Sequence, residues 1–427
     1  MTSPAVALLL AALASLAWGT QGARLLQADQ TFEVANITLE FAAYNNMLDE
    51  PLLTVSKASK AGRQLYYEVP QAPVGVLAFF HGCAHNAYDL WPPQLGCEEC
   101  RGLPGEVSHT KQALSLGYAV VAMNSLDRSN DPSKETYRCF SYSDDRESAV
   151  EALKDIISDL ELEDLPLYLA GVSSGGSFAL KLLKDLSGEL EVSGVISEVL
   201  SIDPDKDSYD FETWPPVAFI EMQKDTPTNE RIERNQEVLA EAGVPAQIIH
   251  VPERAVYPTF FSDQAADISP QLSIKIVAAL KQIGVLDEKG WLLDDPRHGF
   301  DSLDWRAELK DRVPELSSSK SVTYSITPDA SDVSELLNTA YSSHEIVGDY
   351  TTACLKWFEG GASDDLEQLA QARGRRPCRA CLREIMGEAR PRSREYVIRK
   401  PALLSAARLQ PGQKPATAGG PPPGPER

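Results

Sequence analysis

The stretch from Leu165 to Leu183, LPLYLAGVSSGGSFALKLL, joins an apolar run to a helical pattern through a serine that lies between glycines. The run has the composition of a buried strand, and the residues after it repeat apolar side chains at helical spacing. Ser173 lies where the two meet. An unactivated serine hydroxyl is a poor nucleophile, and a sharp strand-to-helix turn gives it the exposure that it needs. Such a turn is crowded, so glycines must flank the serine. We predict that Ser173 is a nucleophile; the alternative is an ordinary tight turn.

Apolar strand patterns alternate with amphipathic helix patterns on both sides of this stretch, and strand signals such as TFEVANITLEF also occur in an entry segment at 24–70. This alternation is typical of an α/β fold, with a mainly parallel central sheet and helices on both of its faces. The predicted strands are 74–82, 117–125, 165–173, 192–203, 215–225 and 245–252, and the predicted helices include 146–164 and 228–243.

The last third of the chain is organised differently. Strand signals fade after about residue 262, and we predict a helical insertion over 262–339 within a domain spanning 24–361. An ordered pattern that ends at Gly360 and Gly361 follows this insertion. From residue 362 to 427 the composition turns basic and rich in proline and glycine, which predicts a disordered tail.

The N-terminus predicts entry into the secretory route. An apolar stretch followed by small residues is typical of a signal peptide, here residues 1–23, although the usual positive charges before it are missing. A glycosylation sequon follows at Asn36. We expect an extracellular or luminal protein with no stable membrane span after signal removal. The formal net charge of −22 argues against a nucleic-acid partner, because phosphate binding needs clustered Lys and Arg.

The chain has seven cysteines, which can be oxidised in a secreted protein. Cys354 lies in an apolar helical pattern, and we interpret it as a free core residue. The pair Cys97-x-x-Cys100 would also suit zinc or thiol chemistry, but no second metal pair stands at the right spacing. We therefore predict a structural disulfide among four cysteines, which allow three connectivities. They are Cys83, Cys97, Cys100 and Cys139, while Cys378 and Cys381 lie in the tail.

A His-Gly turn in FFHGCAHN ends the strand at 74–82. This turn comes before the serine in the chain, where a second donor for a developing oxyanion is expected. We predict that the donors are the amides of Cys83 and Ser174. His81 is interpreted as a brace for the loop, and His85 stays ambiguous between loop support and another role.

The remaining members of a catalytic triad should follow later strands. Asp225 ends the strand at 215–225, where a carboxylate could orient an imidazole, and Asp203 is its competitor. For the base we predict His344, which stands in a loop just before an amphipathic helix. The loop residue His298 is an alternative, whereas His250 lies within a predicted strand and is interpreted as structural.

The order Ser173, Asp225, His344 resembles the α/β-hydrolase superfamily over about residues 70–360. The segments HGCAHN, CEECRGLPGE, SSGGSFAL and AYSSHEI are more closely similar to a family of secretory α/β-hydrolases of plants and algae. The HGC turn with an S-x-G-G elbow is also similar to polyhydroxybutyrate-depolymerase-type esterases. The insertion and the basic tail depart from the pattern.

The resemblance implies a serine hydrolase that cleaves a carboxylic ester, small or polymeric, through an acyl-enzyme. It implies no metal and no organic cofactor. Two alternatives stay open: a catalytically silent scaffold that binds a ligand, and an acyltransferase or peptidase that uses the same triad.

Overall fold

The structure is a computed structural model that describes residues 53–374, apart from 130–137, 207–208, 301 and 319–320. All of these residues lie in the first of the chain's two compact units, Met1–Leu382. The predicted signal peptide, the entry strand TFEVANITLEF, the sequon at Asn36 and the cysteines Cys378 and Cys381 lie outside the described residues.

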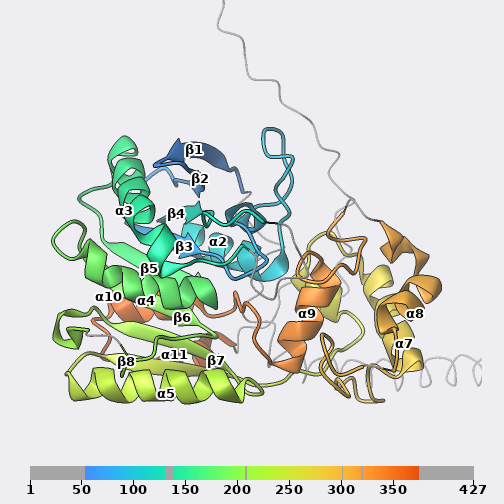
Figure 1. Cartoon of the computed structure of the whole chain (residues 1–427). Helices are drawn as coiled ribbons and strands as arrows, with labels where there is room; N and C mark the ends of the chain where they lie inside the picture. Colours follow the sequence, from blue (N-terminus) through green and yellow to red (C-terminus); the bar gives the residue numbers. More distant parts are fainter. Residues whose placement is uncertain (1–52, 130–137, 207–208, 301, 319–320, 375–427) are drawn as a thin grey trace, which may run out of the picture. The chain divides into compact units, whose positions relative to one another are not determined.

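One eight-stranded sheet forms the centre of the fold, in the order β1-β2-β4-β3-β5-β6-β7-β8 (Figure 1). Strands β1 and β2 form an antiparallel hairpin, β2 pairs antiparallel with β4, and all pairings from β4 to β8 are parallel. This confirms the predicted α/β-hydrolase fold. The strands are β1 Ser56–Lys60, β2 Arg63–Glu68, β3 Gly75–Phe80, β4 Tyr118–Met123, β5 Leu167–Val172, β6 Val192–Glu198, β7 Val217–Met222 and β8 Ala246–Val251.

Helices cover both faces of the sheet, as predicted, because the central strands are apolar on both sides. In β3, Leu77 and Phe79 pack with one helix layer, whereas Val76, Ala78 and Phe80 pack with the other. The first layer consists of α2 (Pro104–Ser115), α10 (Thr351–Glu359) and α11 (Leu366–Gly374). The second layer consists of α3 (Tyr142–Asp159), α4 (Ser174–Leu186) and α5 (Thr226–Glu241).

The segment between β8 and α10 is helical, as the sequence predicts, and has a hydrophobic core of its own that runs from Val256 to Ala340. Figure 1 shows its helices α7, α8 and α9 grouped beside the sheet. Ser269 caps the start of α7 by accepting a hydrogen bond from the Leu272 amide, and Gly284 ends α7 in the left-handed conformation. The helices are α6 Phe260–Gln264, α7 Pro270–Ile283, α8 Trp305–Arg312 and α9 Asp332–Tyr341; the short 3-10 helices of the chain are η2 Ala87–Leu90, η3 Phe211–Thr213 and η4 Pro314–Ser317.

The ordered chain extends beyond residue 361, so the prediction of disorder is wrong for the start of the tail. Helix α11 begins at Leu366, and Leu366 and Ala370 are buried. The Gln247 side chain, on β8, accepts a hydrogen bond from the Leu366 amide at 2.8 Å. Two apolar residues four positions apart are enough to fix one helical turn against a sheet edge.

The two disulfides lie in the predicted region, and they settle the open connectivity as Cys83–Cys139 and Cys97–Cys100. Cys354 is a free, buried thiol in α10, as predicted. Because a disulfide occupies Cys97 and Cys100, this pair is not available as zinc ligands in this state.

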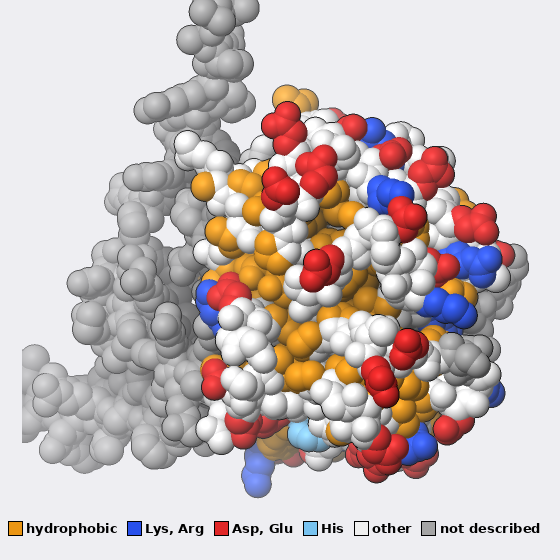
Figure 2. All heavy atoms as spheres, turned by 90° about the vertical axis from the view of Figure 1, so that its left-hand side faces the viewer, with side chains coloured by type: hydrophobic (Ala, Val, Ile, Leu, Met, Phe, Trp, Pro, Cys, Tyr) orange, Lys and Arg blue, Asp and Glu red, His pale blue; other side chains and the backbone are white. Residues whose placement is uncertain are grey.

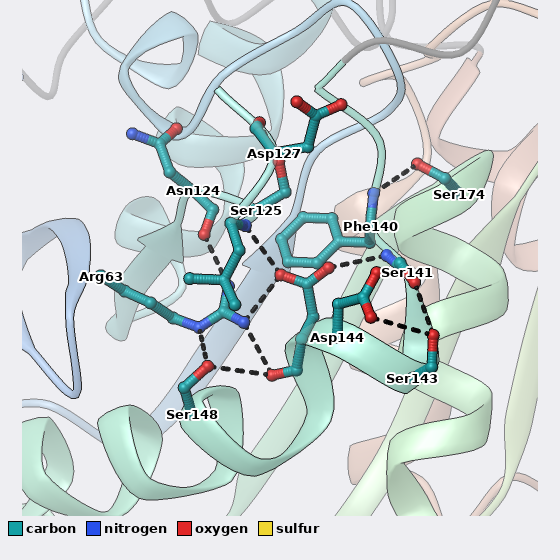
Figure 3. Close-up of polar contacts among 12 residues, drawn as sticks. Arg63, Asn124, Ser125, Asp127, Phe140, Ser141, Ser143, Asp144, Ser148 and Ser174 are labelled. Atoms are coloured by element: carbon teal, nitrogen blue, oxygen red, sulfur yellow. Dashed lines mark hydrogen bonds and ion pairs between the residues drawn. The ribbon is translucent and has the colours of Figure 1, made fainter. Parts of the chain in front are cut away.

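A buried arginine joins the hairpin to the loops beside the serine turn (Figure 3). Arg63, at the start of β2, has a fully buried side chain and forms an ion pair with Asp145 at 2.7 Å. It also donates to the Asn124 carbonyl at 2.8 Å. The Asp145 carboxylate in turn accepts hydrogen bonds from the amides of Leu126 and Ser141. One charge pair therefore holds the loops after β4 and before α3.

The surface carries mixed charge. Figure 2 shows a face on which hydrophobic side chains gather near the centre, with acidic and basic side chains interspersed around them. Within the described part of the chain, no helix combines the length and the apolar character that crossing a bilayer requires.

We expect Arg63→Met to lower the free energy of unfolding by about 3–5 kcal/mol, because Asp145 would be left as an uncompensated buried charge. Chemical denaturation followed by circular dichroism measures this change. Lys60→Met is the matched control, since Lys60 forms an ion pair with Asp159 on the surface. We expect it to leave the unfolding midpoint unchanged. Equal losses in the two variants would contradict a special role for the buried pair.

Candidate active site

Ser173 occupies the sharp turn between β5 and α4, with φ 51° and ψ −117°. A serine rarely adopts a positive φ, and such strain persists only where the surroundings fix it. The Ser173 amide donates to the Glu198 carbonyl at 2.9 Å, and its carbonyl accepts from the Ser177 amide at 3.0 Å. A Cβ on Gly175 would lie 2.1 Å from the Phe80 carbonyl oxygen, so only glycine fits there. The predicted elbow geometry is present.

The structure brings Ser173, His344 and Asp225 into one hydrogen-bonded chain. Ser173 Oγ lies 2.9 Å from His344 Nε2, and His344 Nδ1 lies 2.6 Å from Asp225 Oδ2. An ionised carboxylate only accepts hydrogen bonds, so Nδ1 carries the proton and Nε2 is left to accept one from the serine. This is the arrangement in which an imidazole can act as a general base.

His344 has a strained backbone, with φ 44°, and neighbouring groups fix its loop. Ser342, which ends α9, also has a positive φ of 61°. Its Oγ donates to the Val251 carbonyl at the end of β8 and accepts from the Gln223 amide just past β7. The loop of His344 is thereby held against the ends of the two strands nearest to Asp225.

Arg297, from the insertion, holds the other side of this loop. Its Nη2 donates to the His344 carbonyl at 2.8 Å and to Glu345 Oε2 at 2.7 Å. Glu345 is buried and also accepts from Asn338 Nδ2 at 2.8 Å. The insertion therefore takes part in the site, because Arg297 fixes the backbone of His344, whose side chain is hydrogen-bonded to Ser173.

The His-Gly turn and His344 line the same pocket, and the ring of His81 contacts the backbone on both sides. His81 Nε2 accepts from the Ser125 amide at 3.1 Å, so Nδ1 carries the proton and donates to the Gly82 carbonyl at 2.7 Å. Burial lowers the pKa of His81 to about 3, which keeps the ring neutral. In a trans peptide the N–H points opposite to the C=O, so fixing the Gly82 carbonyl also fixes the Cys83 amide.

The two predicted oxyanion donors lie in the His-Gly turn and at the start of α4, and the segment of Cys139 and Phe140 links these two places. Cys83 lines the pocket, and its side chain forms the disulfide with Cys139. The next residue, Phe140, donates its amide to Ser174 Oγ at 3.3 Å (Figure 3). Within the described residues, the Cys83 amide donates no hydrogen bond to another protein group.

His85 forms a buried pair with the carboxylate of Glu106. His85 Nδ1 lies 2.8 Å from Glu106 Oε1, and both residues are buried. Burial disfavours the imidazolium, but the Glu106 carboxylate outweighs this effect and raises the pKa of His85 to about 9. His85 is therefore a cation at neutral pH.

A pocket of about 320 Å³ opens above Ser173 and His344. Its wall combines the His-Gly turn with residues from the insertion, so it is polar as well as apolar. The residues that matter for its chemistry are Cys83, His85, Glu106, Arg297, Asp329 and Glu345.

The alternatives for the acid and the base lie elsewhere or have other contacts. Asp203 is bound to Lys206 at 2.9 Å in a loop after β6, not to a histidine. His250 is a largely exposed residue of β8 that pairs with Glu221 at 2.6 Å. His298 lines the pocket, but the Ser173 hydroxyl is bonded to His344 instead.

Sequence reasoning missed Glu198, which links the elbow to the loop of His344. Its carbonyl accepts from the Ser173 amide, and its carboxylate accepts from the Val347 amide at 3.1 Å. His109 Nε2 lies 3.1 Å from the same carboxylate. An acid that ends an apolar strand beside the elbow is a signal that could have indicated this role.

Three buried side chains, His85, Asp89 and Glu106, place possible metal-binding atoms within 4.8 Å of one another. Each of them already has a partner of opposite charge: His85 pairs with Glu106, and Asp89 with Arg101 at 3.5 Å. We describe them as an ion-pair cluster and assign no metal to them.

No protein-family model matches this sequence, and no curated protein matches it either. The similarity to plant and algal hydrolases or to polyhydroxybutyrate depolymerases therefore stays a prediction.

Several solved structures are similar in part. A bacterial heroin esterase is 17% identical, with 51% of this chain and 83% of the esterase covered and a TM-score of 0.36. An esterase from Pyrobaculum calidifontis is 15% identical, with coverage of 59% and 90% and a TM-score of 0.36. A hormone-sensitive lipase from a metagenome library is 13% identical, with coverage of 49% and 80% and a TM-score of 0.33. Similarity at this level says nothing about the reaction of this chain.

We expect Arg297→Gln to slow the reaction of Ser173 with a fluorophosphonate probe about tenfold or more, because a small displacement of His344 weakens its action as a base. Arg297→Lys keeps the charge but not the forked donor geometry, and should recover part of the rate. The control is Arg312→Gln, which removes an exposed ion pair with Glu308 in the same insertion. A rate unchanged in Arg297→Gln would show that the loop of His344 does not depend on this contact.

We expect the double variant Cys83→Ser, Cys139→Ser to lose about 4 kcal/mol of stability, because this disulfide closes a loop with a sequence separation of 56. Its probe reaction should also slow, since the Cys83 amide loses its tether. The matched control is Cys97→Ser, Cys100→Ser, where a separation of 3 predicts a loss below about 2 kcal/mol. Thermal unfolding and probe labelling measure both effects. Equal losses of stability and of probe reaction rate in the two double variants would contradict a special role for the Cys83–Cys139 disulfide.

Proposed function

We propose that this protein is a serine hydrolase that cleaves a carboxylic ester through an acyl-enzyme on Ser173. The observation that carries the proposal is the continuous hydrogen-bonded chain from Ser173 through His344 to Asp225, on an elbow with strained backbone geometry. Strain of this kind is retained where function needs it.

In the first step, His344 Nε2 takes the proton of the Ser173 hydroxyl while Oγ bonds to the carbonyl carbon. Asp225 keeps the imidazole in the required tautomer and stabilises the imidazolium that forms. The amides of Cys83 and Ser174 stabilise the oxyanion, and loss of one such donor costs roughly 3–4 kcal/mol in the enzymes where it was measured. The imidazolium then protonates the departing alcohol.

In the second step, water attacks the acyl-enzyme. His344 takes a proton from the water as its oxygen bonds to the acyl carbon, and then returns this proton to Ser173 Oγ. The free acid leaves. This chemistry uses the residues described above and draws on no cofactor.

Two disulfides in the described region support the proposal that the protein acts in an oxidising compartment, extracellular or luminal. The segments HGCAHN, CEECRGLPGE, SSGGSFAL and AYSSHEI support a place among secretory plant and algal hydrolases, and the HGC turn with the S-x-G-G elbow supports a similarity to polyhydroxybutyrate-depolymerase-type esterases. We propose a small or polymeric ester as substrate and no nucleic-acid partner.

The test is covalent labelling of the full, disulfide-intact chain with a fluorophosphonate, together with an ester panel. We expect labelling and hydrolysis in the wild type and neither in Ser173→Ala, because that variant lacks the nucleophile. Ser187→Ala, at the exposed end of α4, is the matched control and should behave as the wild type.

Two results would change the proposal. A folded wild type that neither reacts with the probe nor cleaves any ester would indicate a silent scaffold that binds a ligand. Product diverted to an added alcohol or amine would indicate acyl transfer instead of hydrolysis.

A further inference from the structure

His85 lines the pocket, and its Nε2 atom has no role in the proposed mechanism. His85 Nδ1 is bonded to Glu106, but Nε2 has no hydrogen-bond partner within the described residues. His85 lines the same pocket as Ser173, and Nε2 is not among the buried unpaired atoms, so this edge of the ring is open to the pocket. By contrast, both ring nitrogens of His81 form hydrogen bonds with backbone groups.

The Glu106 pair determines what this open edge can do. A carboxylate only accepts, so Nδ1 carries a proton, and in a neutral ring Nε2 would be an acceptor. In the imidazolium both nitrogens donate. Because the pKa of His85 is raised to about 9, the cation is the main form at neutral pH. The charged or titratable groups around the ring are Glu106 from α2, Asp89 from η2, His81 from its own loop, Glu345 beside His344 and Arg297 from the insertion.

The charges of the pocket indicate which acceptor would suit this donor. His85 and Glu106 neutralise each other, and so do Arg297 and Glu345. Asp329 is the remaining acidic side chain of the pocket lining, and the Arg306 guanidinium acts on it from outside that lining. A free carboxylate on the substrate would be repelled by the Asp329 carboxylate, whereas an uncharged oxygen would not.

We propose that His85 forms a substrate subsite in which its Nε2–H donates a hydrogen bond to an uncharged oxygen of the acyl part, such as an ether, hydroxyl or second carbonyl. His85 lies two residues after Cys83, whose amide is the proposed oxyanion donor, so this oxygen would lie near the scissile carbonyl. The inference rests on the proposed function and narrows its substrate class to oxygenated acyl esters. His85 is thus a specificity-determining residue held in place by Glu106.

The test compares two esters of the same length and leaving group, p-nitrophenyl methoxyacetate and p-nitrophenyl butyrate. They differ only in an ether oxygen that replaces a methylene. The measured quantity is the ratio of their kcat/KM values, and comparison between enzyme variants cancels the difference in intrinsic reactivity. We expect His85→Phe to lower this ratio about tenfold or more, as for loss of a hydrogen bond from a charged donor.

A pH series adds a readout that a structural role would not move. In the wild type the ratio should fall as the pH rises from 8 toward 9.5, because Nε2 changes from donor to acceptor when His85 loses its charge. In His85→Phe the ratio should not change over this range. Glu106→Gln is the second variant, to be used if His85→Phe does not fold. Because it removes the carboxylate that raises the pKa of His85, the ratio of kcat/KM values should fall at a lower pH than in the wild type.

The chain offers a matched control in His250→Phe. His250 also pairs with a glutamate, Glu221, but it lies on β8 outside the pocket. We expect its ratio to equal that of the wild type. A ratio in His85→Phe equal to the wild-type ratio would overturn the proposal.

The same panel separates the remaining outcomes. If p-nitrophenyl hemisuccinate is the preferred ester and His85→Phe abolishes this preference, the subsite binds a carboxylate and the proposed class is wrong. Hydrolysis of all esters with no His85-dependent preference overturns only this inference. Absence of both hydrolysis and Ser173 labelling overturns it together with the proposed function.

Discussion

The backbone of Ser173 is the constraint on which the rest of the site depends. A positive φ at a non-glycine residue costs about 1–3 kcal/mol, and here three neighbouring elements fix it. The Glu198 carbonyl of β6 accepts a hydrogen bond from the Ser173 amide, and the Ser177 amide of α4 donates one to the Ser173 carbonyl. The end of β3 approaches so closely that Gly175 cannot carry a side chain. The same contacts bring the His-Gly turn, which follows β3, next to the hydroxyl. The same contacts therefore determine both the backbone geometry of Ser173 and the position of the His-Gly turn.

The proximity of Ser173, Asp225 and His344 and most of the parallel sheet could be anticipated because each has a local sequence signature. Apolar strands, the glycines around Ser173 and a late histidine can be recognised within a few residues of sequence. Helix α11 and Arg297 could not be recognised in this way. Two apolar residues in a polar segment are a weak signal for α11. Arg297 acts on His344 across 47 residues, and nothing near it in the sequence indicates its partner. Contacts that depend on tertiary packing leave no periodic pattern.

Part of the chain's acidity is buried beside the pocket. Burial raises the pKa of Asp332 to about 7 and that of Glu335 well above its usual range, and nearby carboxylates add to both effects. The Glu335 carboxyl group nevertheless accepts a hydrogen bond from the Gly105 amide at the start of α2. Buried acids of this kind lower stability when ionised. Glu335 also connects the insertion to α2, which carries Glu106, so one buried acid both costs stability and links the insertion to the pocket wall.

The separation of the triad in the chain has a consequence for synthesis. Ser173 and His344 are 171 residues apart, and the whole insertion lies between Asp225 and His344. Ribosomes add about 5–20 residues per second, so Ser173 is synthesised ~10–30 s before His344. During that interval the nascent chain contains Ser173 without its hydrogen-bond partner His344. The hydrogen-bonded chain from Ser173 through His344 to Asp225 can therefore form only after the whole insertion has been synthesised, so the proposed activity would arise late in synthesis.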